Sequence, residues 1–544
     1  MRLFWLGILG MLALIVGCGQ SAGSGEEVDA AAPILRPLAS GNLLRDGTAL
    51  YPRLVRLASS GSANGRVLAS VVQPPENGQP GKGLIYESTS GGASFSQVGT
   101  VTDSLASGGL CCSTLYELPH AVGSLNAGTL LWAASVGQDA TNRRMSLRVW
   151  KSTDVGRTWT YLSACVTATT TGGLWEPEFS IASDGALVCH YSDETDGVHS
   201  QKLARVRSSD GVNWGNRSDT VASSLGSDRP GMAVVRKLPN GTYFMTYEIC
   251  AASGQCTCVV HSRTSPDGWN WGSATDLGIR PETPDGKYFK HAPTTAWAPS
   301  PSGNGRLLLV GQILYNKDGS VASGNGTTLL ANTENGTGLW YELPAPVGVP
   351  GAYDNYCPNY SSALLPSADG KSVLEMATDY AGGVCKASFA SGSLQGTRDA
   401  SGIVSGGTYR LINVNSGLCL DVPQDSRVQV QLQQWTCNGL GPQNWLVGAS
   451  ASGTFTLKGQ NSGLCMDVDK DSRSPGGVVQ QYTCNGLGPQ NWRFEALGLG
   501  YYRLVGQNSG LCLDVTGGSR ALEAKMQQYT CNDLAPQLWK VERR

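Results

Sequence analysis

Ser152-Thr153-Asp154-Val155-Gly156-Arg157-Thr158-Trp159 is the stretch that decides the fold, because the chain repeats it at a regular distance. Shorter versions of this S-x-D-x-G-x-T-W box occur at 208–214 and 265–271, and a degenerate copy at 88–95 has Ser90 in place of the Asp. In such a turn the Asp or Ser oxygen accepts backbone N–H groups while Gly lets the chain reverse. We therefore expect the Asp residues of the boxes to be structural and not catalytic.

A turn glycine followed by an apolar strand recurs at a constant distance from the boxes. It occurs six times, at positions 65, 128, 185, 241, 305 and 370, and each box follows its glycine by 25 or 26 residues. About 60 residues per repeat is enough for a four-stranded sheet. The boxes resemble the Asp-boxes of sialidase-type propellers, and the six repeats predict a six-bladed β-propeller over residues 36–395.

The composition favours an all-β protein and argues against a nucleic-acid partner. The 544 residues suffice for two or more domains and include 71 Gly, with short strands and turns in place of long amphipathic helical patterns. The 40 Lys and Arg nearly balance the 42 Asp and Glu, and no basic run stands out.

The N-terminus has the features of a targeting segment. Arg2 precedes an apolar run over 3–16, which is shorter than the roughly 20 residues needed to span a bilayer. The run leads into Leu14-Ile15-Val16-Gly17-Cys18, which resembles a bacterial lipobox and implies lipidation of Cys18; an ordinary signal peptide is the alternative. We expect a lipoprotein signal at 1–18, a flexible tether at 19–35, and an extracellular or surface-anchored monomer whose lipid is its only attachment to a membrane.

Three copies of one unit make up the C-terminal region. After a Gly/Ser-rich linker expected at 396–407, residues 408–544 repeat N-S-G-L-C-[LM]-D-V, Q-Q-[WY]-T-C-N and P-Q-[NL]-W. This pattern is similar to that of the ricin-type β-trefoil lectins with their Q-x-W signature. The cysteine spacing suggests one disulfide in each lobe: Cys419–Cys437, Cys465–Cys484 and Cys512–Cys531.

The resemblance to these lectins implies a sugar site in each lobe. An aromatic ring stacks on the C–H face of a sugar while Asp and Asn bond its hydroxyl groups. Because all three lobes retain an Asp, an aromatic residue and an Asn at these positions, we expect at least two lobes to bind a sugar. A trefoil with inactive sites is the alternative. The sets are Asp421, Trp435 and Asn438; Asp467, Tyr482 and Asn485; and Asp514, Tyr529 and Asn532.

The nine other cysteines beyond Cys18 have no pairing that the sequence reveals. A cysteine cluster can indicate zinc, but export and the lack of nearby His ligands favour disulfides. We expect neither a metal nor another cofactor.

Polar residues of the innermost strands are expected around the central channel of the propeller, where such folds place their sites. In the third repeat, Trp175 and Glu178 belong to the same strand as Glu176. Glu248 ends the second strand of the fourth repeat, and a carboxylate after an apolar strand is costly unless it is paired or used. The six residues predicted to form the ring are Arg53, Glu117, Glu176, Arg229, His291 and Tyr360.

The segments G-L-W-E176-P-E-F, D-R229-P-G-M and L-P-N-G-T-Y-F-M-T-Y-E248 resemble glycoside hydrolase family 93, the exo-α-1,5-L-arabinanases that release arabinobiose with retention. The resemblance implies that Glu176 is the general acid/base and Glu248 the nucleophile, with Tyr360 nearby. Glu178 is the alternative acid/base, since Glu176 and Glu178 flank Pro177 and are expected to lie on the same face of the strand. Arg53, Glu117, Trp175, Glu178, Arg229 and His291 are the expected substrate-binding residues.

Two other functions remain open at this stage. An exo-α-sialidase needs three arginines for the sialic acid carboxylate and a Tyr nucleophile, and no third ring arginine is evident. A non-catalytic glycan-binding protein is the second alternative, against which the Glu176 and Glu248 motifs argue.

Overall fold

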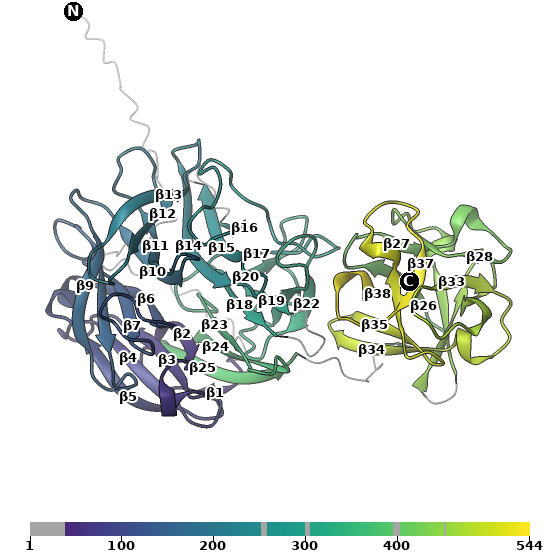
Figure 1. Ribbon diagram of the computed structural model, residues 1–544, viewed down its shortest axis with the longest axis horizontal. Helices are drawn as coiled ribbons and strands as arrows, with labels where there is room; N and C mark the ends of the chain where they lie inside the picture. Colours follow the sequence, from purple (N-terminus) through teal and green to yellow (C-terminus); the bar gives the residue numbers. More distant parts are fainter. Residues whose placement is uncertain (1–38, 252–257, 300–304, 395–402, 451–452) are drawn as a thin grey trace, which may run out of the picture.

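The computed structural model describes residues 39–251, 258–299, 305–394, 403–450 and 453–544. Two all-β bodies lie side by side, a propeller and a smaller C-terminal body (Figure 1). Within the described ranges, no helix is long and apolar enough to cross a membrane. The predicted signal peptide with Cys18, and the tether, lie outside the described residues.

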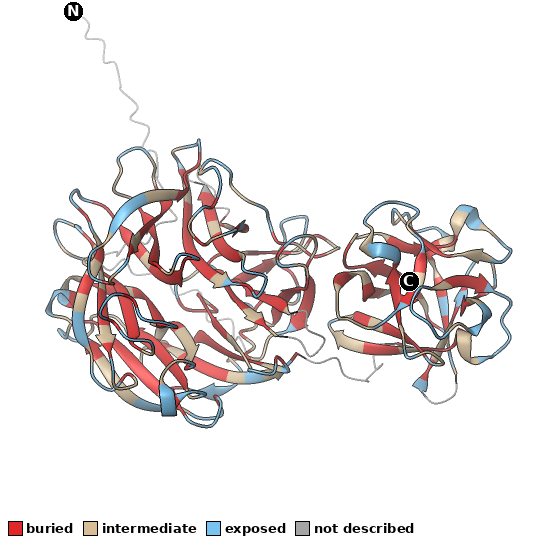
Figure 2. Cartoon of the chain, viewed as in Figure 1, coloured by how far each residue is buried: buried red, intermediate tan, exposed pale blue. Residues whose placement is uncertain are grey.

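Blades one to three are regular four-stranded antiparallel sheets that follow one another along the chain. Burial is concentrated in their inner strands, while turns and outer strands are more exposed (Figure 2). Their strands are β2 (Leu50–Arg56), β3 (Val67–Gln73), β4 (Lys82–Ser88) and β5 (Ser96–Thr102); β6 (Leu110–Glu117), β7 (Leu130–Val136), β8 (Ser146–Ser152) and β9 (Thr160–Thr167); and β10 (Leu174–Ile181), β11 (Leu187–Asp193), β12 (Lys202–Ser208) and β13 (Gly215–Val221).

Blades four to six complete the ring. Blade four has a fifth strand, and in blade six the N-terminal strand β1 (Asn42–Leu43) pairs with β25, so the two ends of the propeller close on one sheet. The strands are β14 (Asp228–Lys237), β15 (Tyr243–Ala251), β16 (Val259–Ser265), β17 (Tyr288–Lys290) and β20 (Ile313–Tyr315); β18 (Thr294–Ala298), β19 (Arg306–Val310), β21 (Thr328–Asn332) and β22 (Tyr341–Pro344); and β23 (Ala363–Pro366), β24 (Ser372–Ala381) and β25 (Val384–Ser393).

The Asp-boxes adopt the expected turns. Asp154 Oδ1 accepts the backbone N–H groups of Arg157 and Thr158 at 3.1 and 2.9 Å. Asp210 and Asp267 bind the backbone of their own turns in the same way. These carboxylates hold turns in place, as the sequence predicts.

The C-terminal body is a β-trefoil around one apolar core that includes Trp445, Trp492 and Trp539, one from each Q-x-W motif. Ile403 belongs to this core, so the trefoil begins within the stretch predicted as linker. Its strands are β26 (Thr408–Asn413), β27 (Cys419–Asp421), β28 (Val430–Gln431), β29 (Gln433–Trp435), β30 (Trp445–Ala449), β31 (Phe455–Gly459), β32 (Cys465–Val468), β33 (Gly477–Tyr482), β34 (Trp492–Gly498), β35 (Tyr501–Gly506), β36 (Cys512–Val515), β37 (Met526–Tyr529) and β38 (Leu538–Arg543).

Candidate active site

A bulge divides the innermost strand of the first four blades into two parts. The pairing with the second strand shifts register at this point, and one residue there has a positive φ that side chains other than glycine rarely adopt. Such strain is found most often at functional sites. The left-handed residues are Tyr51 (52°), Cys112 (59°), Glu176 (48°) and Met232 (59°).

Residues at or just before the bulges of blades one to three line one end of the channel. A cavity of about 570 Å³ opens there, with aromatic walls from Tyr51, Trp175, Tyr356 and Tyr360. The rings of Tyr51 and Tyr360 lie 6.3 Å apart between their centroids. A pocket of this size and lining suits a small ligand with a flat apolar face, such as a sugar. We call it the mouth cavity.

Glu176 stands at the bulge of blade three and follows Trp175, which lines this cavity. Its Oε2 accepts the hydroxyl proton of Ser192 at 2.6 Å. Burial raises the pKa of Glu176 to about 7; the Ser192 hydrogen bond opposes this rise, while the charge of Glu194 adds to it. The side chain can therefore carry a proton near neutral pH.

Glu248 lies on the second strand of blade four, directly opposite Gly231, the residue before the bulge at Met232. Its Oε2 accepts the Ala292 backbone N–H at 2.7 Å. Burial raises the pKa of Glu248 to about 8, and although the Ala292 N–H lowers it, the charges of Glu176 and Asp354 raise it further. Two carboxylates close enough to affect each other cannot both ionise easily, so the pair holds one proton near neutral pH.

Tyr360 completes this group. Its pKa is raised well above the ordinary value, first by burial and then by the charges of Glu248 and Glu176. The phenol therefore stays protonated, and its hydroxyl lies 3.4 Å from the Met232 sulfur. The structure thus brings Glu176, Glu248 and Tyr360 together.

Arg229 is on the same side but is held by other groups. It contacts Glu194 at 2.5 Å and Gln201 at 2.8 Å. Glu194 also pairs with Arg143 at 3.0 Å, and the Arg143 guanidinium lies 5.4 Å from the centre of the Trp175 ring. Arg229 and Arg143 therefore share one carboxylate, which compensates one of their two positive charges.

Glu178 and Arg53 come after the bulges of their strands, and the Arg53 guanidinium lies 4.2 Å from the centre of the Tyr51 ring. They line a second cavity of about 770 Å³ at the other end of the channel. Glu178 pairs with Arg236 at 2.6 Å and accepts the Thr114 hydroxyl at 3.0 Å. The expectation that Glu176 and Glu178 share one face is wrong, because the bulge between Trp175 and Glu178 breaks the alternation of the strand.

Glu117 lies farther along its strand and does not join the ring. Its carboxylate accepts the backbone N–H groups of Ala58 and Ser59, at 2.7 and 3.0 Å, and the hydroxyl of Ser60. These bonds tie blade two to the first turn of blade one. Its position favours a structural role over the predicted contact with substrate.

His291 lies near Glu248 but faces a disulfide. Ligand atoms of Glu248, Cys250, Cys258 and His291 lie within 4.8 Å of one another. Cys250 and Cys258 are bonded to each other and offer no thiolate, so this set does not suit a metal ion. His291 Nε2 is 3.7 Å from Asp354.

Several residues of this region escape sequence reasoning. Tyr51, Arg143, Tyr356 and the bonded pair Cys111–Cys112 line the mouth cavity, and Asp354 influences Glu248. Two signals in the sequence could have pointed to some of them: Cys111 and Cys112 form a doublet, and Tyr51 stands two residues before the predicted site residue Arg53. No motif in the sequence points to Arg143, Asp354 or Tyr356. A third propeller disulfide joins Cys357 to Cys385, and Cys165 and Cys189 are free.

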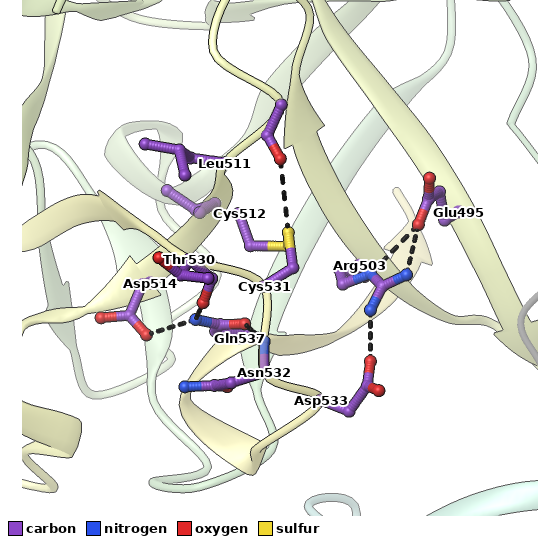
Figure 3. Close-up of a disulfide and its surroundings, with 12 residues drawn as sticks. Glu495, Arg503, Leu511, Cys512, Asp514, Thr530, Cys531, Asn532, Asp533 and Gln537 are labelled. Carbon is purple, nitrogen blue, oxygen red and sulfur yellow. Dashed lines mark hydrogen bonds and ion pairs between the residues drawn. A yellow bond between two sulfur atoms is a disulfide. The ribbon is translucent and has the colours of Figure 1, made fainter. Parts of the chain in front are cut away.

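The trefoil contains the three disulfides that the spacing suggests. In each lobe the Asp carboxylate accepts two Gln amides: Asp421 from Gln433 and Gln443, Asp467 from Gln480 and Gln490, and Asp514 from Gln527 and Gln537. Figure 3 shows Asp514, Gln537 and Asn532 beside the Cys512–Cys531 bond in the third lobe.

The aromatic residues of these sites remain accessible. Tyr482 is 39% exposed and Tyr529 is 43% exposed, while Trp435 is half-buried. Asn438 and Asn485 use Oδ1 to accept a backbone N–H of their own loops. An accessible ring next to an ordered Asp and Asn is an arrangement that suits a sugar.

Comparison with known proteins supports both parts of the chain. Residues 401–482 and 488–544 match the family of ricin-type beta-trefoil lectin domain-like proteins. The alpha-L-arabinanase of Penicillium chrysogenum, solved with arabinobiose, is 27% identical with a TM-score of 0.54, over 66% of this chain and 99% of that chain. The GH93 alpha-L-arabinofuranosidase of Fusarium graminearum, also solved with arabinobiose, is 24% identical with a TM-score of 0.54, over 66% and 98%. No curated protein matches the chain.

The expected fold is therefore confirmed in both bodies, and the motifs that resemble family 93 lie in the part of the chain that matches these enzymes. The chain joins a glycoside hydrolase-type six-bladed propeller, similar to those of the GH93 enzymes, to a ricin-type β-trefoil.

Proposed function

We propose that the propeller is a retaining glycoside hydrolase that acts on the end of α-1,5-linked L-arabinan and releases arabinobiose. The observation that carries this proposal is the pair Glu176 and Glu248, each with a raised pKa, beside Tyr360, which lines an aromatic cavity. Retaining glycosidases need one protonated and one ionised carboxyl group on either side of the scissile bond.

The proposed mechanism starts from the form in which Glu248 is ionised and Glu176 is protonated, although the higher pKa of Glu248 leaves the shared proton mostly on Glu248 before substrate binds. Glu248 then attacks the anomeric carbon while Glu176 gives its proton to the departing oxygen. Glu176, now ionised, then removes a proton from water as the water displaces Glu248 from the sugar. The Ala292 N–H stabilises Glu248 in its ionised form, and Ser192 does the same for Glu176 after the first step. Glu176 is preferred over Glu178 because Glu178 is paired with Arg236 at the far cavity.

The mouth cavity favours action on the end of a chain. Its volume of about 570 Å³ is in the range of pockets for small ligands. Besides the aromatic walls, Gln138, Asp139 and Arg143 line it. These polar groups can bond the hydroxyls of a sugar whose ring lies against Trp175 or Tyr356.

The sialidase alternative fits the site less well. A sialic acid carboxylate needs unpaired cations, but Arg229 and Arg143 share Glu194, and Arg53 lines the other cavity. A neutral sugar substrate suits these charges better.

The trefoil is proposed to hold the enzyme on plant cell-wall polysaccharide through its Asp, aromatic and Asn sets. The N-terminal sequence supports export as a lipoprotein anchored through Cys18, with the propeller and trefoil outside the cell. A cell-surface location would place both domains where polysaccharides are found.

The proposal is tested by incubating the protein with linear arabinan and, separately, with sialyl-lactose, and resolving the products by chromatography. Arabinobiose as the first product is the expected result, and Glu248→Gln should abolish it. Release of sialic acid without arabinobiose would favour the sialidase, and an absence of products from both substrates would favour a glycan-binding protein.

A further inference from the structure

The third lobe of the trefoil differs from the other two at a few positions of one loop. Lobes one and two both read N-G-L-G-P-Q-N-W, at 438–445 and 485–492, whereas lobe three reads N-D-L-A-P-Q-L-W at 532–539. The next residue is Leu446 in lobe one, Arg493 in lobe two and Lys540 in lobe three. Repeats of one unit need the same residues for folding, so positions that change in one copy point to a contact that only this copy makes.

The apolar changes are buried against blade five of the propeller. Ala535 and Leu538, which replace Gly and Asn, are 2% and 1% exposed. They belong to one apolar cluster with Tyr341 and Leu343 of β22 and with Ala296 of β18. The rings of Tyr341 and Tyr501 lie 5.9 Å apart across the same contact.

Lys540 joins two carboxylates of the propeller. Its Nζ lies 2.5 Å from Asp285 and 3.5 Å from Glu342, while Lys287 of the propeller also contacts Glu342, at 2.8 Å. Two cations therefore face two anions, and the side chain of Lys540 is only 10% exposed. Because a buried cation is costly without partners, Lys540 fixes the lobe at these carboxylates.

The loop itself is covered only in lobe three. Leu440 and Leu487 are each 61% exposed in the first two lobes, whereas their counterpart Leu534 is half-buried. The Ala535 backbone N–H donates to Glu334 of the propeller at 3.3 Å. The sugar-stacking ring of this lobe is not covered, since Tyr529 is 43% exposed.

We propose that the third lobe is a docking lobe whose partner is blade five of the same chain, so that the trefoil is held rigidly on the propeller and its sugar sites keep a fixed orientation relative to the mouth cavity. In Figure 1 the trefoil lies next to the side of the propeller that carries β18, β19 and β22. Ala535, Leu538 and Lys540 are the positions that specify the contact.

The test replaces these residues with those of lobe one. The triple variant Ala535→Gly, Leu538→Asn, Lys540→Leu should fold, because lobe one folds with the same three residues at Gly441, Asn444 and Leu446. The matched control is Leu446→Lys, the reverse change at the equivalent, 39% exposed position of lobe one. Small-angle X-ray scattering of the full-length protein measures the maximum dimension, and calorimetry counts the unfolding transitions.

The wild type and the control should scatter as one compact arrangement and unfold in one transition. The triple variant should have a larger maximum dimension, a scattering curve that needs several domain arrangements, and two separate transitions. Unchanged scattering and a single transition in the triple variant would overturn the proposal. So would a wild type that already samples several arrangements and unfolds in two independent steps.

Discussion

Two pairs of glutamates in the propeller, all from the inner two strands of a blade, differ in what surrounds them. Glu117 and Glu178 are buried, and their oxygens are bound by backbone N–H groups, hydroxyls and Arg236. Glu176 accepts the Ser192 hydroxyl and Glu248 accepts the Ala292 backbone N–H, and burial raises the pKa of both groups. The difference separates carboxylates that stabilise the fold from carboxylates that remain able to exchange a proton.

The largest expected effect follows from removing either reactive carboxylate. Glu248→Gln should abolish turnover of arabinan, since an amide cannot form the glycosyl-enzyme. Glu176→Gln should lower kcat by roughly 10²–10⁴-fold, the usual contribution of a general acid/base. Steady-state kinetics on linear arabinan would measure both, with trefoil binding to polysaccharide as the control for folding. Near-wild-type rates in Glu248→Gln would remove it as the nucleophile.

The next largest effect is the pH dependence of the activity that Glu176 and Glu248 support. The proposed reaction needs one proton on the two groups: a second proton blocks the nucleophile, and loss of the first removes the acid. Because both pKa values are raised, to about 7 and about 8, kcat/KM should peak well above the pH of ~4.3 at which an ordinary Glu titrates.

Glu176→Gln sharpens this test, since it should remove the alkaline limb of the profile and keep the acidic one. A wild-type optimum near pH 4 to 5 would show that the pair is not perturbed as the structure indicates.

Substitution of Glu117 or Glu178 should lower the stability of the fold and leave the rate of catalysis nearly unchanged. Glu117→Gln presents an amide N–H₂ to groups that are themselves donors, and should lower the free energy of unfolding by about 1–3 kcal/mol. Glu178→Gln should cost about 1–2 kcal/mol, because Arg236 is partly exposed and its ion pair is screened. Denaturant titration measures both, and kcat of the folded variants should remain within a few fold. A loss of kcat as large as that of Glu176→Gln would place Glu178 in the reaction.

The smallest effect concerns the trefoil. Tyr482→Ala removes one stacking ring, which contributes about 0.5–1.5 kcal/mol, and should weaken binding to polysaccharide by roughly 2–10-fold. Affinity electrophoresis in arabinan gels measures this, and Tyr482→Phe should bind nearly as well as the wild type. Hydrolysis of short soluble substrates should not change in either variant.

The repeats of the sequence predict the fold well, because turn glycines, Asp-boxes and Q-x-W motifs are local signals that recur. The position of Glu248 on the second strand of blade four follows from the same repeats. Which of the predicted site residues line which cavity could not be predicted, since a bulge at Glu176 breaks the alternation on which that inference depends. Pairings such as Cys357–Cys385, which join distant parts of blade six, have no local signal either.

The most direct test of the account is to trap the glycosyl-enzyme. Glu176→Gln is incubated with a nitrophenyl arabinofuranoside, whose leaving group departs without an acid, so that the intermediate accumulates when the base for its hydrolysis is missing. Peptide mass spectrometry then identifies the modified residue. The added sugar mass is expected on Glu248; an adduct on Tyr360 or Glu178 would contradict the proposed mechanism.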